Sequence, residues 1–105
     1  MTNRTPPQAR YDELDAADRR RLIRATVLIY QTHHDGDDIL SFRQLEVIGG
    51  LAPLADGATA AELEGLDARD LDTLVSTAVE LADHYGLDDE DLDRAVQRAR
   101  RLADL

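Results

Sequence analysis

The stretch DARDLDTLVSTAVELADHY, residues 67–85, carries the most regular pattern in the chain. Its apolar residues recur at the 3.6-residue spacing of an α-helix, at Leu71, Leu74, Val75, Ala78, Val79, Ala82 and Tyr85. Asp67 suits the start of a helix, because a carboxylate accepts hydrogen bonds from free amides there, and Gly86 suits the position just past its end. The stretch therefore predicts an amphipathic helix with one face against a core.

A second long helix is predicted N-terminal to this one, over residues 11–33. Its apolar residues cover so much of the helix circumference that we expect it to lie at the centre of the core. Residues 1–10 contain two prolines and no periodic apolar face, which is typical of a flexible arm. The sequence therefore predicts an N-terminal arm over 1–10 and a helical domain over 11–105.

Three shorter helices complete the prediction. Ser41 and Gln44 have the spacing of a capping box, in which each side chain accepts from the backbone amide of the other residue. The same spacing recurs at the start of a predicted short helix over 59–65. Asp88 is predicted to cap a last helix that carries arginines near its C-terminal end. With 105 residues, the expected fold is all-α: one domain, a compact array of about five short helices.

The composition excludes several classes of protein. The chain has no cysteine, so disulfide frameworks, thiolate metal sites and thiol nucleophiles are excluded. The longest nearly unbroken apolar run, residues 22–30, is less than half of the roughly 20 residues that a bilayer span requires. The N-terminus lacks the apolar segment of a secretory signal, so we expect a cytoplasmic protein without membrane contact.

Charge is the strongest compositional signal. Twelve basic residues, all arginine, stand against 22 acidic residues, and the formal net charge is −10. An arginine-only, aspartate-rich chain is typical of a GC-rich coding sequence and of proteins adapted to high salt, which predicts a halophilic source as one alternative. The arginine clusters are expected to lie on solvated helix faces, in pairs four residues apart such as Asp15 with Arg19 and Glu90 with Arg94.

Residues 33–44 resemble the loop of an EF-hand, since they join two predicted helices and place Asp35, Asp37 and Ser41 at ligand positions of that motif. The resemblance implies a divalent cation, Ca²⁺ or Mg²⁺, held by these three residues. The segment departs from the motif at three positions, His33, Asp38 and Gln44. Because Gln44 stands where the bidentate glutamate belongs, any such ion would bind weakly.

A different alternative is a regulator of the helix-turn-helix type. Residues 59–82, which comprise a short helix, a tight turn at Leu66 and Asp67 and a longer amphipathic helix, have the outline of that motif. Arg69 would be the first residue to contact a base. Asp67, Asp70 and Asp72 would face phosphates with like charge, so a nucleic-acid partner is not expected.

Catalysis is not expected, because neither serine lies in a nucleophile elbow and no phosphate-binding glycine loop is present. The favoured hypothesis is a small acidic interaction or regulatory module that binds another protein or itself as a homodimer, without a cofactor. Gly49 and Gly50 are predicted to end or kink their helix, which would leave the leucines that follow without a sheltering element. The predicted contact surface comprises Phe42, Leu45, Ile48, Leu51 and Leu54.

Overall fold

The structure is a computed structural model that describes residues 11–33 and 36–103. Within these residues it has no strand and seven helical segments: α2 (Ala16–Thr32), α3 (Gly36–Ile39), α4 (Phe42–Leu51), α5 (Leu54–Gly57), α6 (Ala60–Glu64), α7 (Ala68–Tyr85) and α8 (Glu90–Ala103). The prediction of a single all-α domain is confirmed. Five of these segments correspond to the predicted helices, and α3 and α5 add one turn each. The arm predicted over 1–10 lies outside the described residues.

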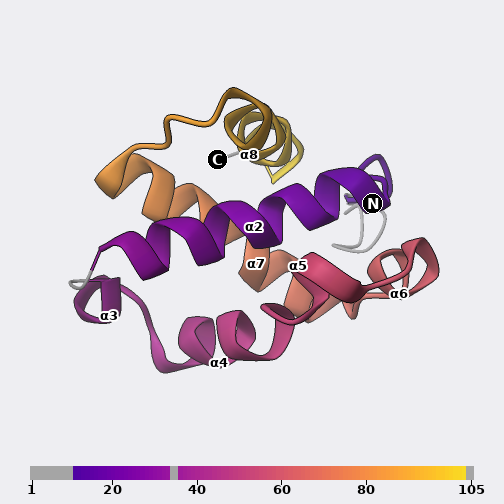
Figure 1. Cartoon of the computed structure of the whole chain (residues 1–105), viewed down its shortest axis with the longest axis horizontal. Coiled ribbons are helices and arrows are strands. Elements are labelled where there is room, and N and C mark those ends of the chain that lie inside the picture. Colours follow the sequence, from indigo (N-terminus) through magenta and orange to yellow (C-terminus); the bar gives the residue numbers. More distant parts are fainter. Residues whose placement is uncertain (1–10, 34–35, 104–105) are drawn as a thin grey trace, which may run out of the picture.

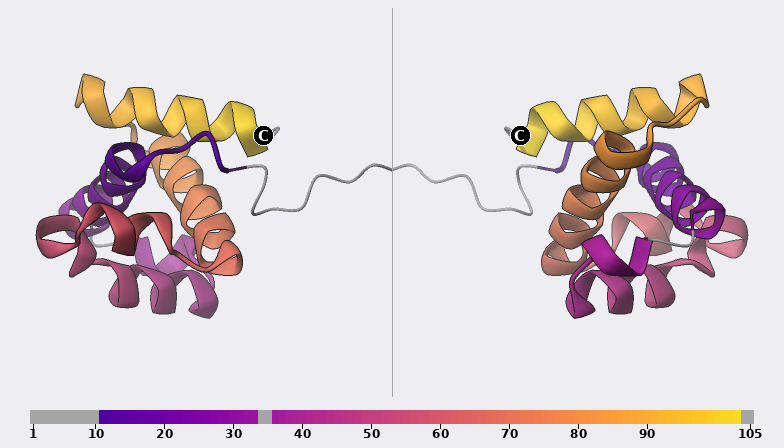
Figure 2. Two further views of the ribbon diagram at one scale, coloured as in Figure 1. Left: turned by 90° about the vertical axis from the view of Figure 1, so that its right-hand side faces the viewer. Right: turned by 90° about the vertical axis from the view of Figure 1, so that its left-hand side faces the viewer.

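The helices form three layers (Figures 1 and 2). α2 and α7 cross in the middle layer, α8 lies across one side of them, and α4 lies with α5 and α6 on the other side. α2 contacts every other helix of more than four residues, which confirms its predicted central place.

The main core fills the space between the layers. Its fully buried members include Leu22 and Ile23 of α2, Leu74 and Val75 of α7, and Val96 of α8. A second cluster lies where the last turns of α2 and α7 meet α4, and comprises Ile29, Leu40, Ile48 and Leu81. Because each layer buries its apolar face against α2 or α7, these two helices together form the scaffold of the domain.

Side-chain caps set most helix boundaries. The amide of Asp18 donates to the Asp15 carboxylate (2.8 Å), so α2 begins after the short turn that starts at Tyr11. Ser41 and Gln44 form the predicted capping box, with amide-to-side-chain distances of 3.1 and 2.8 Å. The cap at Asp67 is as predicted. At the start of α6 only half of the predicted capping box forms, because the Thr59 hydroxyl accepts the Glu62 amide (3.2 Å) but donates to the Glu62 carboxylate, which does not reach the Thr59 amide. These boundaries follow from local sequence because a cap involves only residues two or three positions apart.

Two boundaries differ from the prediction. The cap of α8 is Asp89 rather than Asp88, since the Leu92 amide donates to the Asp89 carboxylate at 3.0 Å. Gly49 and Gly50 do not end α4, which runs through both to Leu51. Glycine in a helix costs about 1 kcal/mol relative to alanine, and burial of the flanking side chains offsets that cost.

Candidate functional site

Arg19 has the most extensive polar environment of any described side chain. It is 6% exposed, and its guanidinium donates to backbone carbonyls of Leu14 (3.0 Å), Leu63 (2.9 Å) and Glu64 (2.8 Å), with a longer contact to Tyr11 (3.4 Å). The predicted Asp15–Arg19 pair on a solvated face is therefore wrong. Arg19 instead links two segments of the chain, because its guanidinium donates both to the turn before α2 and to the last turn of α6. It is therefore a structural residue rather than part of a binding surface.

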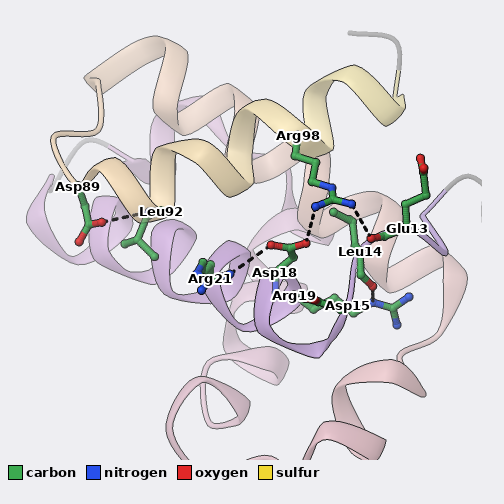
Figure 3. Close-up of polar contacts among 9 residues, drawn as sticks. All are labelled: Glu13, Leu14, Asp15, Asp18, Arg19, Arg21, Asp89, Leu92 and Arg98. Carbon is green, nitrogen blue, oxygen red and sulfur yellow. Dashed lines mark hydrogen bonds and ion pairs between the residues drawn. The ribbon is translucent and has the colours of Figure 1, made fainter.

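A second polar cluster fastens α8 to α2 (Figure 3). Arg98 of α8 is 3.5 Å from the Asp18 carboxylate and donates to the carbonyl of Glu13 at 3.2 Å. Arg21 reaches the same carboxylate at 3.3 Å. Arg98 joins α8 to α2 and to the chain before it, and Arg21 pairs with Asp18 within α2, so the cluster explains how α8 docks.

Of the three residues predicted to hold a divalent ion, only the side chain of Ser41 lies within the described part of the chain. Asp35 lies outside the described residues, and the side chain of Asp37 is not described. The Ser41 hydroxyl accepts the Gln44 amide as the cap of α4. Among the described side chains, no three His, Cys, Asp or Glu residues are grouped in a way that could hold a metal ion. Ion binding by this loop stays a prediction.

The predicted contact surface is mostly inside the domain. Phe42 is 80% exposed, whereas Ile48 and Leu51 are each 7% exposed and Leu45 and Leu54 are partly buried against the core. The expectation that the segment after Gly50 lacks shelter is wrong, because Leu51 belongs to the unbroken α4 and Leu54 to α5, and both helices pack against α2. Of the five residues, only Phe42 protrudes into solvent.

The segment with the outline of a helix-turn-helix motif is also not positioned as it would be in a DNA-binding domain. α7, which would be the recognition helix, is the scaffold helix and contacts α2, α4 and α8. Arg69 is exposed at its start, but Asp70 in the next position pairs with Arg43 at 2.6 Å. Beyond its first turn, α7 exposes acidic side chains such as Glu80 and Asp83, which would face DNA phosphates with like charge.

A further depression of the surface lies where the C-terminal ends of α2 and α7 meet. Figure 1 shows these two helix ends close to each other. We name this depression of about 580 Å³ the α2–α7 groove. It is lined by Leu28, Ile29, Thr32, His33, Tyr85, Gly86, Leu87, Asp88 and Asp89. Ligand pockets in proteins have volumes of about 300–1,000 Å³, so the groove has room for one or two side chains of a partner.

The apolar part of the groove has a rigid base. Ile29 is buried in the second core cluster, and Tyr85 and Leu87 pack against the same cluster. The rings of His33 and Tyr85 stack with centroids 4.1 Å apart and an angle of 11°, while the His84 ring meets Tyr85 edge-on. Leu28 stands at the edge and is 45% exposed. The groove thus presents an aliphatic side chain and a fixed aromatic surface to solvent.

The polar part of the groove is acidic. Asp88 and Asp89 are exposed, and among the described residues they are the only carboxylate or arginine side chains that line the groove. The Asp89 carboxylate also caps α8. Gly86, two residues before Asp88, has φ of +83°, a conformation that residues other than glycine rarely adopt. The glycine therefore fixes the direction in which the chain leaves α7 and places the two aspartates beside the stacked rings.

The sequence contains one signal for this groove, which does not enter the prediction of the contact surface around Phe42. The helix over 11–33 has more apolar residues than one buried face needs, and Leu28 is the surplus one. The stack of His33 on Tyr85 has no sequence signal, because 52 positions separate two residues that meet only through the packing of α2 on α7.

Comparison of the chain with models of protein families, with curated proteins and with solved structures finds no match. No helix within the described residues is both long and apolar enough to cross a membrane.

Proposed function

We propose that this chain is a small non-catalytic module that binds another protein through the α2–α7 groove. The observation that carries the proposal is Leu28, a large aliphatic side chain left 45% exposed beside a concave surface whose base is rigid. Concave apolar surfaces with a few polar groups at the edge are the usual form of binding sites for side chains of a partner.

The chemistry of the lining supports binding rather than catalysis. The Thr32 hydroxyl donates to the Leu28 carbonyl at 2.6 Å, so this hydroxyl is already hydrogen-bonded to the backbone of its own helix. The His33 ring is stacked on Tyr85, and no hydroxyl or carboxylate of the described residues is hydrogen-bonded to it. A nucleophile–base pair needs such a hydrogen bond, so the arrangement favours recognition over reaction.

A peptide-display selection tests the proposal. The full chain is the bait, and the variants are Leu28→Glu, which places a charge at the edge of the groove, and Phe42→Ser, which removes the other exposed large apolar side chain as a matched control. Both positions are at the surface, so circular dichroism and thermal unfolding are expected to match the wild type.

We expect the wild type and Phe42→Ser to enrich the same peptides and Leu28→Glu to lose them. Enrichment that persists with Leu28→Glu and disappears with Phe42→Ser would place the binding surface at the start of α4. Equal enrichment by all three baits would show that the α2–α7 groove is not the binding surface.

A further inference from the structure

We propose that the occupant of the α2–α7 groove is a basic segment of a partner protein, in which an apolar side chain is followed directly by arginine or lysine. This inference rests on the proposed function and names the class of partner. It follows from the order of surfaces along the groove: an apolar wall, a pair of stacked rings and an acidic edge.

The apolar wall sets the first requirement. Leu28 and Leu87 have surface to bury, and Ile29 below them is closed into the core. A partner's aliphatic or aromatic side chain would bury its surface against these residues without any rearrangement of the core. An aspartate or glutamate entering here would lose contact with water without a cation to pair with, since no arginine is among the described residues that line the groove.

The acidic edge sets the second requirement. Asp88 and Asp89 follow Leu87 directly, so a cation bound by them lies next to the apolar side chain in the groove. The stacked His33 and Tyr85 rings line the same groove, so the apolar side chain that precedes the cation meets an aromatic as well as an aliphatic surface. The net charge of −10 also favours a basic partner, because it accelerates association with cations and repels anions.

A second copy of the chain is the competing occupant. Phe42 is exposed and is followed by Arg43, so the chain itself carries an apolar side chain next to a cation. Two features weigh against it. Arg43 is already paired with Asp70 at 2.6 Å, and two chains of charge −10 repel each other.

Chemical-shift titration with short peptides tests the inference directly. The probes are three hexapeptides, GSLRSG, GSARSG and GSLESG, added at millimolar concentration to the full Phe42→Ser protein, in which the competing self-contact is removed. We expect GSLRSG to shift the methyl signals of Leu28 and Leu87 and the ring signals of Tyr85. GSARSG, without the apolar side chain, and GSLESG, with the charge reversed, are expected to bind far more weakly.

Two aspartate variants isolate the cation. Asp88→Asn removes one exposed charge from the edge and leaves the Asp89 cap of α8 in place, so we expect it to weaken GSLRSG binding by about two- to fivefold. Asp56→Asn, at an exposed aspartate of α5 outside the groove, is the matched control and is expected to leave binding unchanged.

The outcomes separate the inference from the proposed function. Equal binding of GSLRSG and GSLESG at the groove would overturn the basic partner while leaving the groove as a binding site. If Leu28→Glu enriches the same peptides as the wild type in the display selection, and no hexapeptide shifts the groove signals, both the basic partner and the groove as a binding site would be overturned. Groove signals of the wild type that move on dilution, when those of Phe42→Ser do not, would assign the groove to a second copy and overturn the basic partner in trans.

Discussion

Replacing Arg19 by methionine is expected to destabilise the protein more than any other arginine substitution within the described residues. Methionine retains most of the aliphatic volume of the side chain, so the change removes mainly the guanidinium. Three short bonds are lost, those to the carbonyls of Leu14, Leu63 and Glu64 at 2.8–3.0 Å. The last two carbonyls belong to the C-terminal turn of α6, where a cation also offsets the helix dipole.

The magnitude follows from these contacts. A hydrogen bond from a charged donor contributes about 1.5–3 kcal/mol, which gives about 4.5 kcal/mol for three bonds at the lower value. Water can reach the partly buried Glu64 contact in the variant, so we expect a loss of about 3–4 kcal/mol. For a domain of this size that corresponds to a fall in Tm of about 12–25 °C.

The assay is urea unfolding followed by helical circular dichroism, compared with Arg19→Lys and Arg21→Met. Lysine keeps the charge but cannot span several carbonyls, so Arg19→Lys is expected to lose about half as much free energy of unfolding. Arg21 is a half-exposed arginine on the same helix, paired with Asp18 at 3.3 Å, and its loss is expected to cost less than about 1 kcal/mol. A loss for Arg19→Met no larger than that for Arg21→Met, at an unchanged slope against urea, would refute the assignment of Arg19 as the anchor of α6.

Other substitutions test the helix boundaries and the charge, each by thermal or urea unfolding. Gly49→Ala and Gly50→Ala place methyl groups in open space within α4 and are each expected to stabilise the protein by about 0.4–1 kcal/mol; a loss at either position would contradict an unbroken α4. Gly86→Ala meets no atom but must adopt φ of +83°, so it is expected to destabilise by about 1 kcal/mol, and a neutral effect would argue against that backbone conformation. Ser41→Ala removes the cap of α4 and is expected to cost about 1 kcal/mol, with Gln44→Ala as the variant that removes only the reciprocal bond. Raising NaCl from low to molar concentration is expected to raise Tm, because salt screens the repulsion within a chain of charge −10; a Tm that does not change would mean that the acidic residues are too far apart to repel.

The sequence by itself determined the helices and most of their ends. The 3.6-residue period over 67–85 and the two capping boxes are local patterns, and the structure places α7, α4 and α6 where those patterns predict them. Local patterns suffice there because a helix and its caps are built from contacts between residues at most four positions apart.

The tertiary structure decided which face of each helix is buried against the core and which residues remain exposed to solvent. Arg19 and Arg21 are two positions apart and look alike in the sequence, yet one is buried on carbonyls of α6 and the other is half-exposed. Ile48 and Leu51 enter the core while Phe42 does not, because α4 passes its two glycines and lies against α7. The α2–α7 groove exists only through a contact across 52 positions, between His33 and Tyr85. The packing of whole helices sets such a contact, and no pattern within one helix specifies it.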